Sequence, residues 1–432
     1  MKTNKEIATY ALDALKKSGA EHAQCLVSSG KVDEFNVDSG EFSLMRTLFN
    51  SSITMKALLN GKKGVITVNK LDKESIDNAV CDCISAADSS VVDEAEAIAP
   101  KEENEDFISG VITPDKNKLF DRIQEFMDDV KNEYPKIVLE QSVSKYSNTE
   151  SVFMNTNGVN YNYTRGHYDI SSTFLARDGE KSSSFNGYGV LLDSLDRKII
   201  DVGMLRTLLE ESQNQIDTVP YAGKFVGKVI ITPACLMDIV LTALGLFTSD
   251  STIIDGTSPW KSMLGKQVAS DKLSISKKPL DPQIVCGERF TGEGFKSANM
   301  DIIKDGILEN FTLSNYASRK TGFPRALNSS YNLFVKPGEI SLNELTKSCD
   351  RGILLNRFSG GQPSTNGDFS GVAKNSFLIE NGKITNALSE TMISGNLIDL
   401  LNSIIGVSSD TICDGYSVLP YILFDGVTVS GK

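Results

Sequence analysis

The order of predicted helices and strands in the first half of this chain occurs twice, and that repetition limits the folds available to it. A helix, a block of strands and a second helix cover residues 7–88, and the same order returns over residues 116–215. Glycines that suit tight turns are spaced 21 residues apart in both blocks of strands, at Gly40 and Gly61 and at Gly158 and Gly179. We predict an internal duplication of a helix–strands–helix unit, with coincidental turn spacing as the alternative.

The second half of the chain, after Pro220, has many short strands and few helices. A run typical of a buried strand at 225–231 precedes an apolar helix at 236–247, and Asp-Gly and Asn-Gly pairs further on predict hairpin turns. These patterns predict an α+β fold, in which an N-terminal α/β region with duplicated units is followed by a β-rich antiparallel C-terminal domain. The predicted domains are 1–105, then 106–219, which packs with the first, and 220–432.

The charge of the chain argues against one class of partner. The formal net charge is −12 over 432 residues, and residues 91–110 contain seven acids and one lysine. An acidic chain without a basic stripe repels the phosphate backbone, so we expect no direct binding of nucleic acid. The acidic run is typical of a solvated linker.

The cysteines and the apolar segments indicate a compartment. Seven cysteines, scattered from Cys25 to Cys413, form no evident disulfide framework and favour reduced thiols in the cytoplasm. The N-terminus has an amphipathic helix pattern without a continuous apolar core, so we expect no signal peptide there. No run of 18 apolar residues occurs, so we expect no membrane span.

Histidine is the natural start for a search for catalytic groups, because hydrolases and metal enzymes depend on it. The chain has two histidines, His22 at the start of a predicted strand and His167 among alternating polar residues. Isolated strand histidines are usually surface or hydrogen-bonded groups. A site built from both histidines stays open, as does a stand-alone hydrolase that uses His167 with Asp169.

Other motifs point to structure more than to chemistry. Cys81 and Cys83 are too close for the usual zinc spacing and face different sides of a helix, which favours core packing. Neither a GxSxG nucleophile elbow nor a GxxxxGK[ST] phosphate loop occurs. Asp368 and Glu390 lie in a glycine-rich region, where solvated acids are the default interpretation.

Several segments of the second half together resemble the TldD/PmbA family of metallopeptidases, on its PmbA (TldE) branch. The segments are VIITPACLMDIVLTALG at 229–245, LGKQVASDKLSI at 264–275, DGILENFTLSNYASRKTG at 305–322, NLFVKPGEISLNELTKSCDRGILL at 332–355, GDFSGVAKNSFLIENGKI at 367–384 and ETMISGNLIDLLNSIIGVSSD at 390–410. Weaker similarity at SGEFSLMR and NGKKGVIT extends into the first half.

The resemblance draws attention to the apolar helix. In the catalytic TldD branch the matching helix carries His-Glu-x-x-x-His, and here those positions read Leu241, Thr242, Ala243, Leu244, Gly245 and Leu246. Leucine has no lone pair for zinc, and threonine replaces the general base. Cys413 lies near the position of a downstream cysteine ligand but lacks its glycine-flanked context. We therefore expect no catalytic, metal-binding or cofactor-binding residue in this chain, and expect Leu241 and Leu246 to stabilise the helix by burial.

What the resemblance implies is a heteromeric peptidase in which this chain is the subunit without zinc. We expect a TldD-like catalytic subunit as partner, which alone would hold zinc, and short or unfolded peptides as substrates, with a homodimer in isolation as an alternative state. Edge strands of the β-rich domain are suited to pair with an extended peptide. A non-enzymatic peptide-binding or assembly protein without a catalytic mate is the alternative function.

Overall fold

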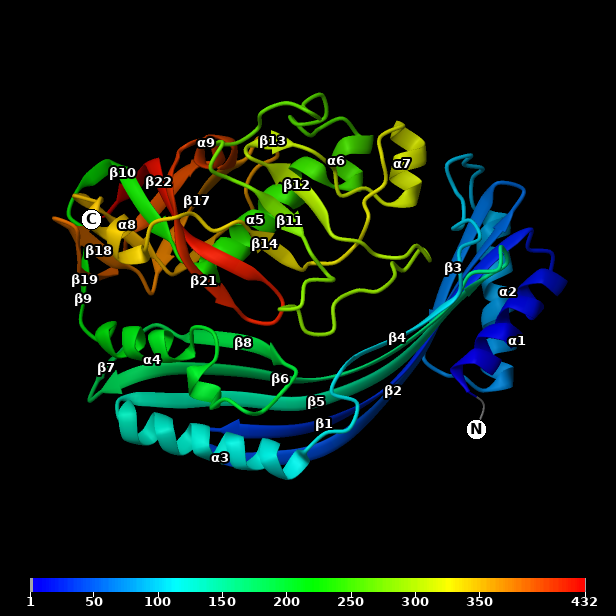
Figure 1. Cartoon of the computed structure of the whole chain (residues 1–432), viewed down its shortest axis with the longest axis horizontal. Coiled ribbons are helices and arrows are strands. Elements are labelled where there is room, and N and C mark those ends of the chain that lie inside the picture. The colour runs from blue at the N-terminus through cyan, green and yellow to red at the C-terminus, as the bar shows by residue number, and fades with distance from the viewer. Residues whose placement is uncertain (1–2, 432) are drawn as a thin grey trace.

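The computed structural model describes residues 3–431, and its first half is one long, curved β-sheet with helices packed on it (Figure 1). The strand order is β3-β2-β1-β5-β6-β4, with β7 and β8 also paired to β6. The elements are α1 (Asn4–Lys17), β1 (His22–Asp38), β2 (Glu41–Leu59), β3 (Lys62–Val68), α2 (Lys73–Ser89), β4 (Glu105–Gly110), α3 (Lys116–Glu133), β5 (Ile137–Asn155), β6 (Asn160–Asp178), β7 (Lys181–Ser182), β8 (Asn186–Leu192) and α4 (Leu205–Asn214).

The element order repeats within this sheet, as the sequence predicts. α1-β1-β2-β3-α2 is followed by α3-β5-β6-β8-α4, and the two units meet where β1 pairs with β5 in antiparallel register. All four turn glycines have positive φ, namely Gly40 (79°), Gly61 (73°), Gly158 (97°) and Gly179 (62°). Each follows a strand and precedes its hairpin partner, so their equal spacing reflects equivalent hairpins. The predicted α+β class is confirmed.

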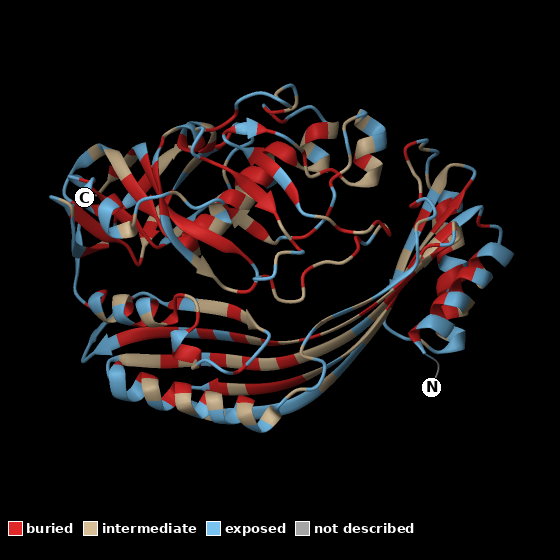
Figure 2. Cartoon of the chain, viewed as in Figure 1, coloured by how far each residue is buried: buried red, intermediate tan, exposed pale blue. Residues whose placement is uncertain are grey.

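Each unit covers its own end of the sheet with helices. α1 begins with a capping box, in which the Thr3 hydroxyl accepts from the Glu6 amide and the Glu6 carboxylate accepts from the Thr3 amide. The apolar faces of α1 and α2 pack on strand residues such as Cys25 and Met55, whereas α3 and α4 pack at the other end, around Phe174. In Figure 2 the sides of α1 and α2 turned to the sheet are buried and their outer sides are exposed.

Up to residue 431, where the described part of the chain ends, the C-terminal half is a 14-stranded sheet with helices on it. Most of its strand pairs are antiparallel, and three are parallel: β10–β15, β14–β22 and β9–β19. Its strands are β9 (Thr218–Pro220), β10 (Lys224–Ile231), β11 (Ile275–Lys277), β12 (Met300–Lys304), β13 (Ile307–Leu308), β14 (Leu333–Val335), β15 (Arg351–Leu355), β16 (Arg357–Gly360), β17 (Asp368–Lys374), β18 (Phe377–Glu380), β19 (Lys383–Ser389), β20 (Met392–Asn396), β21 (Ile404–Cys413) and β22 (Val418–Ser430). Its helices are α5 (Pro233–Thr248), α6 (Asp250–Ile254), α7 (Asn315–Thr321), α8 (Leu342–Lys347) and α9 (Leu397–Asn402).

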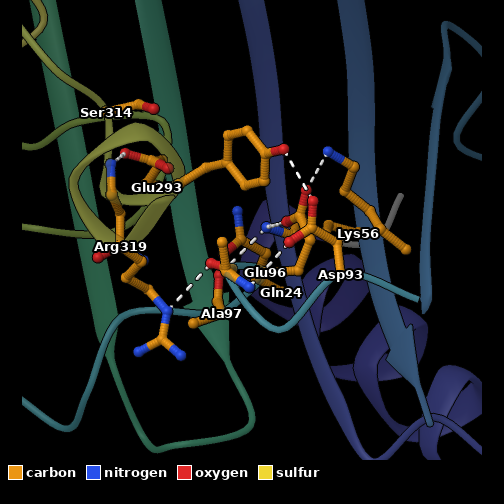
Figure 3. A network of polar contacts seen from close by, with 12 residues as sticks. Gln24, Lys56, Asp93, Glu96, Ala97, Glu293, Ser314 and Arg319 are labelled. Carbon is orange, nitrogen blue, oxygen red and sulfur yellow. Dashed lines mark hydrogen bonds and ion pairs between the residues drawn. The ribbon is translucent and has the colours of Figure 1, made fainter. Parts of the chain in front are cut away.

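The acidic segment after α2 is not the solvated linker that its composition predicts. Glu96, with a side chain 4% exposed, forms ion pairs with Lys56 of β2 (2.8 Å) and with Lys63 of β3. Asp93 accepts hydrogen bonds from Tyr316 (2.9 Å) and Lys320 (2.8 Å) of α7. Figure 3 shows the acidic side chains gathered between the strands and α7. The segment therefore joins the two halves of the chain, because Glu96 is held by lysines of the first half and Asp93 by residues of α7 in the second.

A second contact between the halves comes from the glycine-containing loop 287–297, which lies over the α1–α2 end of the sheet. The ring of Phe290 packs against Tyr161 and Tyr163 of β6, and Tyr163 donates a hydrogen bond to the carbonyl of Gly287 (2.9 Å). β4, at residues 105–110, pairs in parallel with β6 beside this loop. The loop thus fixes the position of the C-terminal domain on the sheet.

Candidate functional site

Helix α5 is the element that the sequence singles out, and it has two cavities beside it. Pro233 stands in its first turn, and a stripe of buried residues follows at helical spacing: Leu236, Val240, Ala243, Leu244 and Phe247. The segment Pro233–Ile254 is apolar and long enough to cross a membrane by length and composition, with a mean hydropathy of 1.4. In this fold, the buried stripe of α5 belongs to the core of the C-terminal domain.

Leu241 and Leu246, which the resemblance aligns with the zinc ligands of the catalytic branch, are only half-buried. Leu241 and Leu246 pack against the edge of the core, and Thr242 is also half-buried. Gly245 is exposed, with open space where a side chain would begin. The leucines therefore contribute part of the burial energy that full enclosure would give.

The residues around α5 do not fit a zinc ion. A zinc site needs three or four nitrogen, sulfur or carboxylate ligands that converge on one point. Among the described residues that line the cavity between Leu241 and β16, Asp238 is the one carboxylate, and none is a histidine or a cysteine. Within residues 3–431, no group of three or more His, Cys, Asp or Glu side chains is arranged to hold a metal. No step of a mechanism can be assigned to a metal held by these residues.

The first cavity, of about 410 Å³, lies between α5 and strand β16. Ile239, Leu241 and Thr242 line it from the helix, and six consecutive residues, 358–363, line it from β16 and the loop after it. Side chains of a strand alternate between its two faces, so consecutive residues at one wall indicate that β16 turns its edge toward the cavity. We call this cavity the groove.

Strand β16 has one recorded neighbour in its sheet. It pairs with β17 in antiparallel register, from Arg357 opposite Lys374 to Gly360 opposite Gly371, and with no other named strand of the described chain. Its second edge therefore carries backbone donors and acceptors without strand partners. Such an edge can take an extended peptide as an added strand.

The second cavity, of about 520 Å³, lies on another side of the same helix. Leu241, Leu244 and Gly245 line it from α5, together with residues of the loop 287–297 and of the segment 312–331. Its charged lining residues are Asp250, Lys277, Glu293 and Arg325. We call this cavity the polar pocket.

The two histidines do not come together. His22 is exposed at the start of β1, whereas His167 of β6 lies across the sheet at the level of Val32. Ten residues of strand separate these levels, or about 30 Å. Burial, with the nearby Arg165 charge, lowers the pKa of His167 to about 4, and its Nδ1 has no hydrogen-bond partner in the described chain.

The combination of His167 with Asp169 has no support as a hydrolase. Burial raises the pKa of Asp169, and the structure records no hydrogen bond between the two side chains. A histidine with a pKa of about 4 is a weak general base at neutral pH. This pair is better explained as partly buried polar residues of the sheet.

The seven cysteines and the two acids of the glycine-rich region, Asp368 and Glu390, line neither the groove nor the polar pocket. Cys413, at the end of β21, donates to the Gln283 carbonyl (3.5 Å), and burial raises the pKa of its thiol. Cys83 is buried in the core under α2, whereas Cys81 is exposed. Asp368 is held by Asn366 and Asn396, whose amides donate to its carboxylate and lower its pKa.

Sequence reasoning missed the residues that line the cavities. β16 lies in a glycine-rich stretch that reads as turns, and Lys277 looks like a surface lysine in SISKKP. A cavity is made by segments far apart in the chain, so no local pattern marks it. A lysine within a run of buried strand residues was the one available signal.

Comparisons with known proteins agree on one family. Residues 223–431 match the model described as the PmbA/TldA metallopeptidase C-terminal domain. Metalloprotease PmbA of Escherichia coli O157:H7 is 27% identical over 272 residues, which are 60% of this chain and 57% of that protein. The zinc metalloprotease TldD homolog of Saccharolobus solfataricus is 29% identical over 259 residues, 56% of this chain and 57% of that protein. The chain thus spans little more than half the length of these curated relatives.

Solved structures share the whole fold. TldE from Thermococcus kodakarensis has a TM-score of 0.83 at 17% identity. The superposition covers 98% of this chain and 100% of the TldE chain. A putative modulator of DNA gyrase from Bacteroides thetaiotaomicron has a TM-score of 0.84 at 22% identity, with 99% of each chain covered. At sequence identities of 17% and 22%, the similarity to these two structures shows a shared fold alone. Residues 223–431 of this chain thus form a C-terminal domain of the PmbA/TldA metallopeptidase family.

Proposed function

We propose that this chain is the PmbA/TldE-like, non-zinc-binding subunit of a cytoplasmic TldD–TldE-type metalloprotease complex that degrades short or unfolded peptides. What supports it is the chemistry of α5, where the family resemblance aligns Leu241, Thr242 and Leu246 with the His-Glu-x-x-x-His motif of the catalytic branch. Two aliphatic side chains supply no metal ligand, and a hydroxyl does not replace a carboxylate base. A TldD-like partner would supply the zinc.

The groove suggests what this chain contributes. The free edge of β16 offers main-chain hydrogen bonds to an extended peptide, and these do not depend on the peptide's sequence. Phe358, Phe369 and Ile393 line the same groove and offer apolar contacts for side chains. Folded proteins keep their strands paired, so such a groove favours short or unfolded chains.

The test is reconstitution with a purified TldD-type subunit. We expect the mixture to elute as a complex whose mass equals the sum of both subunits in light scattering. We also expect peptide hydrolysis to be at least tenfold faster than with either subunit alone. Two results would refute the proposal together: this chain elutes only with itself, and the TldD-type subunit alone has full activity.

A peptide-binding protein without a catalytic mate is the second candidate, and one observation favours it. The free edge of β16 and the apolar side chains beside it are both on this chain, and together they are suited to hold an extended peptide. Fluorescence anisotropy with an extended peptide and with its backbone N-methylated form would measure that binding. Tight binding by the chain alone, with no complex formed with any TldD-type subunit, would favour this candidate.

A further inference from the structure

Lys277 is a buried cation with no anion beside it. It ends β11, is 7% exposed, and lines the polar pocket next to Leu241 and Gly245 of α5. The structure records no hydrogen bond or ion pair for its Nζ among residues 3–431, and its recorded neighbour is the Tyr331 ring, 5.8 Å from Nζ to the centroid. Burial lowers the pKa of this ammonium group. An unpaired buried charge is costly, so a residue of this kind calls for a partner.

The carboxylates near Lys277 are engaged elsewhere. Asp250 accepts from the amide and the hydroxyl of Ser314 (2.9 and 2.6 Å), and Glu293 accepts from the Asn315 amide (2.8 Å). Glu288, which attracts the Lys277 charge from further away, accepts from Ser297 and Ser329. None of these acids forms an ion pair with Lys277 in the described chain.

Arg325 adds a second cation to the pocket. Its guanidinium lies over the Phe295 ring, 3.8 Å from Cζ to the centroid, and Nη1 donates to the Ala326 carbonyl (2.6 Å). The structure records no partner for its Nε and Nη2 groups among residues 3–431. A guanidinium held flat by an aromatic ring is suited to bind a planar carboxylate.

We propose that the polar pocket binds a carboxylate of a peptide between Lys277 and Arg325. This inference deepens the proposed function, since it rests on peptides being the ligands of this chain. A singly charged carboxylate fits better than a phosphate, because Asp250 and Glu293 in the same wall would repel a second negative charge. The apolar lining, with Leu241, Leu244, Leu313 and Ala326, suits the side chain of the residue that carries the carboxylate.

Fluorescence anisotropy on the isolated chain tests the proposal with three labelled probes. The first is fluorescein–Gly-Ala-Ala-Ala-Leu with a free C-terminal carboxylate, and the second is its C-terminal amide. The third is an amide with glutamate in place of the last alanine. We expect the acid to bind at least tenfold more tightly than the amide, as for a charge-assisted hydrogen bond in a buried site. If the glutamate amide binds as tightly as the acid, the carboxylate comes from a side chain.

Variants separate charge recognition from a structural role. Lys277→Met should abolish the preference for the acid, Lys277→Arg should keep it within a few-fold, and Lys383→Met, at an exposed lysine of β19, should change nothing. Lys277→Met should also fold and resist urea at least as well as the natural chain, because it removes an unpaired buried charge. If Lys277 instead had a structural role, its replacement by methionine would lower the unfolding free energy of the chain.

The inference is overturned if acid, amide and glutamate amide bind equally, or not at all, to the natural chain. It is also overturned if Lys277→Met keeps the preference. Because these measurements use the chain alone, failure to form a complex with a TldD-type subunit would refute the proposed function and leave this result intact.

Discussion

Glu211 of α4 is mostly buried where the sheet half meets the C-terminal domain, and its replacement by glutamine tests how that contact depends on pH. Its Oε2 accepts a hydrogen bond from Asn356 Nδ2 (2.7 Å), and Asn356 directly precedes the groove strand β16. Asn356 Oδ1 is buried and has no donor in the described chain. A protonated carboxyl or a glutamine amide at position 211 brings both an acceptor and a donor to this asparagine.

The size and sign of the effect follow from the pKa. Burial raises the pKa of Glu211 from 4.5 to about 8, against the opposing hydrogen bond from Asn356. The folded state thus holds a proton that the unfolded state has released, and stability is lost as pH rises from about 4.5 to about 8. At about 1.4 kcal/mol per pH unit, the largest loss of unfolding free energy that this shift can cause is about 5 kcal/mol. Relaxation and water entry reduce such penalties, so we expect about 2–3 kcal/mol.

Urea unfolding at pH 5 and pH 9 measures this difference. Glu211→Gln should unfold like the natural chain at pH 5 and should be more stable by about 2–3 kcal/mol at pH 9. Glu210→Gln, at the exposed neighbouring position on the same helix, serves as the matched control and should change stability by less than about 0.5 kcal/mol. Equal stability of Glu211→Gln and the natural chain at pH 9 would refute the reasoning.

Three further predictions use other parts of the fold. Gly245→Ala should stabilise α5 by about 0.5–1 kcal/mol, seen in the thermal midpoint, because its new methyl group meets open space in a helix interior; a lower midpoint would show a hidden contact. Glu96→Gln should lower the unfolding free energy by about 2–3 kcal/mol in urea, because Lys56 and Lys63 lose their shared carboxylate; no change would show that the network is loose. The Hε1 resonance of His167 should titrate near pH 4 in NMR spectra, and a midpoint near 6.5 would contradict its burial.

The duplicated half was predictable because its signals are local. Turn glycines such as Gly61 and Gly158 take positive φ at hairpin ends, and amphipathic helices such as α3 show one apolar face in the sequence. These patterns gave the element order without any knowledge of how distant segments meet. The family resemblance likewise rested on segments of the C-terminal domain, which the matching family model covers.

What the sequence could not give depends on contacts between distant residues. Glu96 and Asp93 look like solvated acids until Lys56, Lys63 and Lys320 lie beside them. The same holds for Lys277, whose burial comes from packing that no neighbour in the chain reveals. The free edge of β16 likewise follows from strand order in a large sheet.

The metal content of the pure chain, without any partner, tests the central claim most directly. After incubation with excess zinc and gel filtration, mass spectrometry of the eluted protein should find far less than one zinc per chain, and the sample should hydrolyse no peptide. Leu241→His with Leu246→His supplies two of the three or four ligands that zinc needs, so this variant should retain more zinc than the natural chain and serves as the positive control for zinc detection. One tightly held zinc per natural chain, retained through gel filtration and accompanied by peptide hydrolysis, would contradict the account.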